Sequence, residues 1–279
     1  MITPPLYCCG CSFWAYEEEA RKRMKPVPVF HPTEEEFADF YKYVTSIESE
    51  VQPFGLCKII PPASWVPRKS GYDNLDVEIP TPIRQYVQGS QGVYQVINVM
   101  EKKMTFEDFK REAQLQEERG LKAAKRRKKP DDKEDEFDEV EELERMYWKN
   151  LAFHAPLYGA DMAGTLFEEP EGPSSWNLKY LDSLLNRKLP QRIPGVTEPY
   201  LYFGMWKAMF GCHTEDMELF SINYLHFGKP KVWYCAAPSQ KERFERLAQV
   251  RLHKILFPTS QLICLIFADP LSPSFQGLL

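Results

Sequence analysis

SINYLHFGKPKVWY, at residues 221–234, is the stretch of sequence that decides the fold. Residues 220–227 and 231–236 are rich in Val and aromatic side chains, which suit a pleated surface, and Gly228-Lys229-Pro230 lies between them. This pattern predicts two strands joined as a hairpin. Short strands separated by Gly and Pro favour a barrel or jelly roll over a doubly wound sheet, and no predicted strand leads into a phosphate-binding glycine loop.

Two capped helices are predicted in the first half of the chain. A Thr33/Glu36 capping box precedes apolar residues spaced by three and four, which indicates a helix with one buried face. These apolar residues are Phe37, Phe40, Tyr41, Val44 and Ile47. Prolines in residues 57–68 favour short extended pieces, residues 93–99 predict a strand, and residues 104–109 open a second helix that runs towards residue 144.

Composition narrows the class of protein. The chain has 279 residues, of which 43% are hydrophobic and 27% charged, so it can bury a substantial core. A net charge of −5 provides no global basic field, and we expect no direct sequence-specific binding of nucleic acid. Seven cysteines suit a reducing compartment. The longest apolar run, residues 262–268, is far shorter than the roughly 20 residues of a membrane-spanning helix, so we expect a soluble intracellular protein with no membrane partner.

A charged segment divides the chain. Residues 125–129 are all Lys or Arg, and an acidic block follows at residues 131–139. Two interpretations stay open, a solvated loop or helix extension and a nuclear-import signal.

His213-Thr214-Glu215 is the candidate metal site. In an extended segment residues two apart point to the same side, so His213 and Glu215 can bind one metal ion. An imidazole and a carboxylate are two of the three ligands in the facial triad of non-haem Fe(II) oxygenases. By itself the motif is also compatible with an ordinary surface or core pair.

The neighbouring motifs resemble a known family. Residues 221–234 and 199–207 (PYLYFGMWK) are similar to the core motifs of the JmjC family of histone lysine demethylases. Residues 28–68 resemble the JmjN segment of the subfamily that demethylates trimethyl-lysine at the lysine-9 and lysine-36 positions of histone H3, and residues 147–164 resemble the lead-in to JmjC. The implied fold is mixed α+β, with a JmjN α/β segment before a JmjC double-stranded β-helix, a cupin-like jelly roll.

The resemblance implies an activity and its cofactors. Fe(II) and 2-oxoglutarate activate oxygen, an N-methyl group is hydroxylated, and formaldehyde is released. The implied partners are the histone H3 tail and chromatin, and the implied location is the nucleus.

The resemblance also implies roles for single residues. His213 and Glu215 match iron ligands. Lys231 matches the lysine that pairs with the distal carboxylate of 2-oxoglutarate, a role that suits a flexible ammonium. Tyr158 matches the tyrosine that donates to the same carboxylate, and Asn223 matches the amide that orients the cosubstrate. For Lys231 the alternative is a solvated hairpin lysine, and for Asn223 a strand amide satisfied by its neighbours.

A second group of matching residues forms the substrate pocket. Gly195, Tyr200 and Tyr202 match positions that line the methylammonium pocket, where oxygen atoms and ring faces attract polarised methyl groups. Phe210 and Trp233 match aromatic walls that restrict water. The alternative for the two tyrosines is ordinary core packing.

The resemblance ends near Gln249. Residues 250–279 lack the pattern of the family's third iron ligand and of its structural zinc ligands, and the zinc site is expected to be absent. His253 is in the wrong context, Cys264 lies in an apolar run, and the Cys-x-x-Cys spacing in residues 8–11 has no second pair. We therefore expect an incomplete barrel with unpaired sheet edges, a two-ligand iron site, and weak or no activity.

Six regions are expected: a divergent tail at 1–27, JmjN at 28–69, linker strands and a helix at 70–112, a charged insertion at 113–145, a partial JmjC at 146–250, and a second divergent tail at 251–279. A non-catalytic module that binds methyl-lysine on chromatin remains the main alternative function. A small-molecule dioxygenase or protein hydroxylase would share the iron site without needing the Gly195, Tyr200 and Tyr202 pocket.

Overall fold

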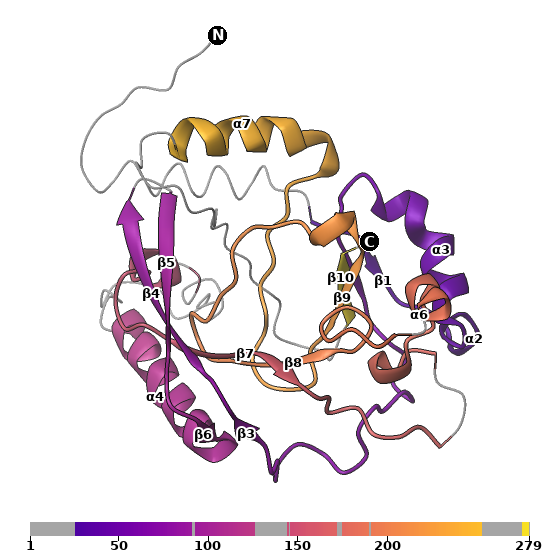
Figure 1. Cartoon of the computed structure of the whole chain (residues 1–279), viewed down its shortest axis with the longest axis horizontal. Coiled ribbons are helices and arrows are strands. Elements are labelled where there is room, and N and C mark those ends of the chain that lie inside the picture. The colour runs from indigo at the N-terminus through magenta and orange to yellow at the C-terminus, as the bar shows by residue number, and fades with distance from the viewer. Residues whose placement is uncertain are drawn as a thin grey trace.

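The computed structural model describes residues 26–90, 93–125, 144, 146–171, 175–189, 191–252 and 275–278. Two four-stranded sheets lie on either side of a central region crossed by residues 205–237 (Figure 1). The first sheet has the order β1-β2-β10-β9, and its strands are Val29–Phe30, Cys57–Ile59, Phe275–Leu278 and Ser221–Tyr224. The second has the order β5-β4-β7-β8, and its strands are Val93–Met100, Ile83–Ser90, Leu157–Ala163 and Tyr200–Gly204.

Helices flank these sheets, and a small third sheet pairs β3 (Glu78–Ile79) with β6 (Met104–Thr105). The α-helices are α2 (Glu34–Phe37), α3 (Phe40–Val51), α4 (Phe106–Lys125), α6 (Leu184–Lys188) and α7 (Lys241–Leu252). Within the described ranges neither large sheet closes into a barrel, so the predicted mixed α+β fold with an incomplete barrel is confirmed. No helix in these ranges combines the length and apolar content needed to cross a bilayer.

The predicted N-terminal helix is two helices. The Thr33/Glu36 capping box is present, but α2 ends at Phe37 and α3 begins afresh at Phe40. The Asp39 carboxylate causes the restart, because it accepts a hydrogen bond from the Lys42 amide as a new N-cap. The restart also changes which residues are buried, and Tyr41, expected on the buried face, is exposed.

The predicted hairpin over residues 220–236 is wrong. β9 covers the middle of its first half, but residues 231–236 form no strand. β9 instead pairs with β10, which lies in residues 251–279, where we expected no barrel strand. The expected strand at 93–99 is confirmed as β5, and the second helix is confirmed as α4 up to Lys125. The predicted continuation towards residue 144, most of the two charged blocks, the cysteines at 8–11, His253 and Cys264 lie outside the described residues.

Trp176 is the centre of the core beside the first sheet. It is 1% exposed, stacks on Phe37 at 4.3 Å between ring centroids, and meets Phe40 edge-on at 4.9 Å. Ile222 and Tyr224 of β9 pack against the same cluster. The Trp176 side chain therefore connects the N-terminal helices to β9, which lies almost 200 residues later in the sequence.

We predict that Trp176→Ala lowers the free energy of unfolding by roughly 3–5 kcal/mol, because it removes a large buried ring and leaves a cavity. Urea unfolding followed by circular dichroism measures the loss. Leu115→Ala, at an exposed position of α4, is the matched control and should change stability by less than about 0.5 kcal/mol. Equal losses in the two variants would contradict this view of the core.

Candidate functional site

The sequence-predicted site residues lie around one cavity between the two large sheets. Its volume is about 2360 Å³, larger than the roughly 300–1,000 Å³ of a small-molecule site, so it has room for a peptide side chain as well. The lining includes all eight predicted residues, which are Tyr158, Gly195, Tyr200, Tyr202, His213, Glu215, Asn223 and Lys231. Phe210 and Trp233 also line it.

His213 and Glu215 lie side by side in an irregular extended segment. His213 Nε2 is 3.8 Å from Glu215 Oε1, as the offset of two residues predicted. His213 Nδ1 is 2.7 Å from the Gly211 carbonyl oxygen, which can only accept a hydrogen bond, so Nδ1 carries the proton. Nε2 then presents its lone pair beside the carboxylate, the arrangement in which metal-binding histidines are commonly held.

A third ligand is not placed with this pair. Within the described ranges no three His, Cys, Asp or Glu side chains are grouped so that they could hold a metal ion. The donor chemistry of His213 and Glu215 fits an Fe(II) ion, but these residues supply two of the three protein ligands expected of a facial triad.

Lys231 is a half-buried cation enclosed by rings. Its Nζ lies 4.9 Å from the ring centroid of Phe210, 5.1 Å from that of Trp233 and 5.8 Å from that of Tyr202. Burial lowers its pKa from 10.5 to about 8, because the charged form loses hydration. Its ammonium forms no ion pair or hydrogen bond with the described residues, and the surrounding rings favour a lysine that faces the cavity over a fully solvated one. A partly desolvated ammonium without an ionic partner favours a bound anion.

Other polar groups around the cavity also lack partners in the described part of the chain. The Trp233 Nε1–H donor is buried without a hydrogen-bond acceptor. The Tyr158 side chain is 7% exposed, and no hydrogen bond joins its hydroxyl or the Asn223 amide side chain to another described residue. Burial raises the pKa of Tyr158, with the Asp161 carboxylate adding to the effect, so its hydroxyl stays protonated and available as a donor.

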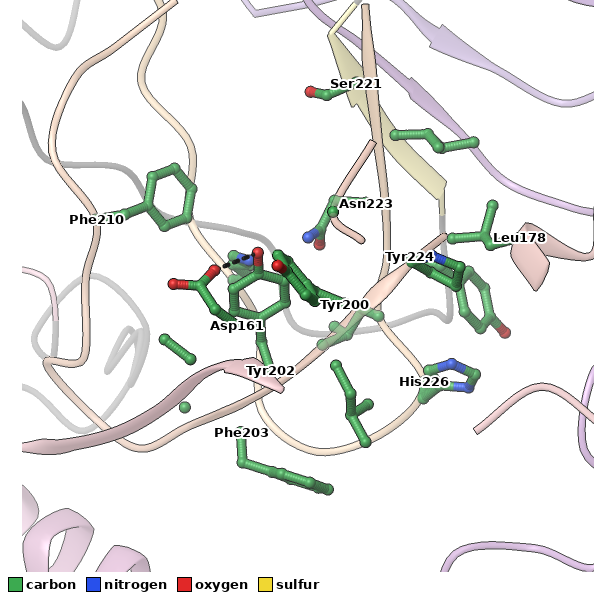
Figure 2. Close-up of a pocket in the computed structure, with 18 of the residues that line it drawn as sticks. Asp161, Leu178, Tyr200, Tyr202, Phe203, Phe210, Ser221, Asn223, Tyr224 and His226 are labelled. Atoms are coloured by element: carbon green, nitrogen blue, oxygen red, sulfur yellow. Dashed lines mark hydrogen bonds between the residues drawn. The ribbon is translucent and has the colours of Figure 1, made fainter. Parts of the chain in front are cut away.

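Gly195 and the two tyrosines form one corner of the cavity. Gly195 has φ of +76°, and a Cβ at this position would lie 2.4 Å from the Tyr200 ring. Glycine is therefore required both for the turn and for the close approach of the ring. The rings of Tyr200 and Tyr202, both labelled in Figure 2, meet edge-on at 6.4 Å between centroids. The Tyr158 ring centroid lies 6.0 Å from that of Tyr202.

Asp161 is the site residue that sequence reasoning missed. Its carboxylate accepts a 2.9 Å hydrogen bond from the Tyr202 hydroxyl, drawn as the dashed line in Figure 2. It lies where the register between β7 and β8 shifts and has φ of +54°. A bulge of this kind redirects a side chain. The sequence signal was a lone Asp after Gly159, too weak to separate from an ordinary turn.

His226 closes one end of the cavity and is held neutral. Its Nδ1 is 3.0 Å from the Tyr72 hydroxyl, and the rings of Phe167 and Tyr224 pack on it. Burial, with a smaller effect of the Arg68 charge, lowers the His226 pKa from 6.5 to about 4. In Figure 2, His226 lies beside Tyr224, away from Asp161 and Phe210.

We predict that stability falls as the pH drops from about 6.5 to about 4, because the unfolded chain binds a proton at His226 that the folded chain excludes. The loss is about 3 kcal/mol at most for this pKa difference. Urea unfolding at several pH values should show a smaller slope for His226→Phe. His31→Gln, at an exposed position, should keep the wild-type slope, and an unchanged slope in His226→Phe would contradict the assignment.

Two family models match the chain. The jmjN domain matches residues 28–61, and the JmjC domain, hydroxylase, matches residues 200–269. The second match contains His213, Glu215, Asn223 and Lys231 and extends beyond Gln249, where the motifs that we compared end.

Curated relatives agree with these matches. The chain is 44% identical over 226 residues to lysine-specific demethylase 4B of Mus musculus, an alignment that covers 80% of this chain and 19% of the relative. It is 42% identical over 246 residues to lysine-specific demethylase 4D of Rattus norvegicus, an alignment that covers 86% of this chain and 44% of the relative. It is 41% identical over 227 residues to probable lysine-specific demethylase 4F of Homo sapiens, an alignment that covers 80% of this chain and 33% of the relative.

The chain thus spans less than half of the length of each of these relatives. The two domain matches and the level of identity lead to one conclusion. The chain belongs to the JmjN/JmjC family that includes the lysine-specific demethylases 4.

Proposed function

We propose that the cavity is the site of an Fe(II)- and 2-oxoglutarate-dependent demethylase of trimethyl-lysine in histone H3. The observation that carries the proposal is the half-buried Lys231 ammonium, unpaired among the described residues, which lines the same cavity as the His213–Glu215 pair. The Lys231 ammonium can bind an anionic group, and the His213–Glu215 pair can bind iron. A cosubstrate that carries a carboxylate and also coordinates iron would use both parts of the cavity.

Three groups would hold 2-oxoglutarate. Lys231 would neutralise its distal carboxylate, and the Tyr158 hydroxyl would donate a hydrogen bond to it. The Asn223 amide would orient the remainder of the molecule from β9. Phe210 and Trp233 surround the ammonium and would keep water away from the ion pair, which strengthens it in a medium of low dielectric constant.

The methyl-lysine pocket would be the corner formed by Gly195, Tyr200 and Tyr202. Ring faces attract a methylated ammonium, and the glycine leaves space beside Tyr200. Because Asp161 accepts the Tyr202 hydroxyl proton in a hydrogen bond, it fixes the ring and directs the phenol oxygen lone pairs towards the cavity.

His213 and Glu215 would bind Fe(II), with Nε2 as the imidazole donor. Iron together with 2-oxoglutarate would supply the oxidation of the N-methyl group that leads to formaldehyde. Because the described residues supply two protein ligands, we propose that these 279 residues turn over weakly or not at all.

The names of the relatives support a proposal for the substrate, the partner and the cellular location. They are named lysine-specific demethylases, so we propose a histone H3 tail as substrate, chromatin as partner and the nucleus as location. We also propose the regions 28–69 for JmjN and 146–250 for a partial JmjC.

A second function is favoured by the same two-ligand site. The tyrosine corner does not depend on the metal ligands, so the chain would bind methyl-lysine without demethylating it. This alternative predicts binding that is independent of iron.

The first test is mass spectrometry of a trimethylated histone H3 tail peptide incubated with the purified chain, Fe(II), 2-oxoglutarate and ascorbate. We predict little or no loss of methyl groups, with any loss abolished in His213→Ala and retained in the exposed control His31→Ala. Strong turnover that depends on His213 would refute the weak-activity proposal and would mean that another group completes the iron site.

The second test measures 2-oxoglutarate affinity by isothermal titration, with Mn²⁺ in place of Fe(II). We predict that affinity falls up to tenfold per pH unit above pH 8, because the Lys231 ammonium with a pKa of about 8 then loses its charge. Lys231→Met should bind at least tenfold more weakly at pH 7. The matched control is Lys42→Met, which changes an exposed lysine of α3 outside the cavity lining. Affinity that does not vary between pH 7 and 9.5 would remove Lys231 from the anion site.

A further inference from the structure

β9 depends on a strand from a distant part of the sequence. Among the described residues, β10 (Phe275–Leu278) is its one ladder partner, and β10 pairs antiparallel with β2 on its other side. We propose that β2 and β9 form the walls of a binding slot for an extended peptide, that the resident peptide is the chain's own segment Phe275–Leu278, and that this segment holds β9 in place.

The slot is one strand wide. Gln276 lies opposite Lys58 of β2 and opposite Asn223 of β9, and the neighbouring positions continue both registers. Two strand spacings of about 4.8 Å separate β2 from β9 by about 10 Å. This separation is too great for direct hydrogen bonds between the walls, so both inner edges require an occupant.

Both β2 and β9 are also held by contacts outside the slot. β2 pairs with β1, and its Ile59 is buried in the Trp176 cluster. On β9, the Tyr224 ring meets Trp65 at 5.3 Å and Phe167 at 5.4 Å. These contacts are made by β2 and β9 themselves, so each wall has packing of its own beside the slot.

The occupant pairs with both walls through its backbone. It has four paired residues, and in the sequence it is separated from α7 by residues 253–274. Strand addition of this kind draws its affinity from main-chain hydrogen bonds, so the chemical class of ligand is an extended, uncharged peptide. The segment SFQGL, residues 274–278, has no charged side chain.

The occupant of the slot contacts a strand that also lines the cavity. Asn223 is the β9 residue opposite Gln276, and it also lines the cavity. An empty slot would leave the inner edge of β9 unpaired and Asn223 on a looser strand. This last consequence for cosubstrate binding rests on the proposed function, whereas the slot does not.

The experiment compares Gln276→Pro with Gln276→Ala in the full chain. Proline lacks the N–H and does not fit a central strand, while alanine keeps the backbone donor. The Lys58 amide donates to the Pro28 carbonyl beside β1, so Cys57 and Ile59 are the β2 residues whose amides face β10. By the same alternation, the amides of Ser221 and Asn223 face β10 from β9. We expect these four amides to exchange with deuterium at least tenfold faster in Gln276→Pro and at wild-type rates in Gln276→Ala. Unchanged exchange in Gln276→Pro would overturn the proposal.

Rescue in trans tests the slot as a binding site. Free SFQGL peptide at millimolar concentration should restore slow exchange in Gln276→Pro, and the same peptide with proline in place of glutamine should not. Failure of SFQGL to restore protection to the folded variant, or equal rescue by both peptides, would overturn the proposal.

A measurement on the wild-type chain covers the case in which Gln276→Pro does not fold. Native-state exchange in low urea should show the amides of β10 opening together with those facing them on β2 and β9, before the amides of α3. Opening of β10 at the global unfolding free energy would contradict an exchangeable occupant. If wild-type chain fails to bind 2-oxoglutarate while these exchange results hold, the proposed function fails and the slot stands.

Discussion

The packing of one indole against aromatic rings from two separate helices sets the frame for the cavity. Trp176 stacks on Phe37 and meets Phe40 edge-on, and the same cluster takes in Tyr224 of β9. This packing joins the N-terminal segment to the strand that carries Asn223. The two segments matched by separate domain models therefore share one core, and the position of a cavity-lining residue depends on both.

Electrostatics then determines what the cavity favours. The Lys231 ammonium is surrounded by rings that stabilise it weakly, while burial lowers its pKa to about 8. Keeping the Lys231 ammonium partly desolvated lowers the stability of the protein, and a bound anion would offset this cost. The Trp233 Nε1–H and the Tyr158 hydroxyl, which also lack partners in the described chain, add neutral donors around the same space.

Local sequence signals predicted local features well. The capping box at Thr33 and the strand at residues 93–99 depend on neighbouring residues, and both are present. The offset of two residues between His213 and Glu215 predicted that their side chains point to the same side, and His213 Nε2 lies 3.8 Å from Glu215 Oε1. The break before α3 was missed because the Asp39 cap competes with a continuous apolar pattern.

Non-local features were beyond sequence reasoning. The partner of β9 comes from residues 275–278, and no periodicity in residues 221–236 could indicate it. Asp161 was missed for a related reason, since its backbone conformation follows from the register between β7 and β8. The eight predicted site residues share one cavity because family motifs carry this long-range information, while their chemical roles remain proposals.

The bulge at Asp161 limits how this position can change over evolutionary time. A left-handed backbone excludes β-branched side chains and disfavours most others, and the Tyr202 hydroxyl requires an acceptor within reach. Glycine satisfies the first condition and fails the second, whereas glutamate accepts a hydrogen bond but is strained in this conformation. Asparagine meets both conditions most closely, because it tolerates the left-handed backbone and its amide oxygen accepts a hydrogen bond at nearly the same place as the Asp161 carboxylate. Change at position 161 therefore favours asparagine while the tyrosine stays in place.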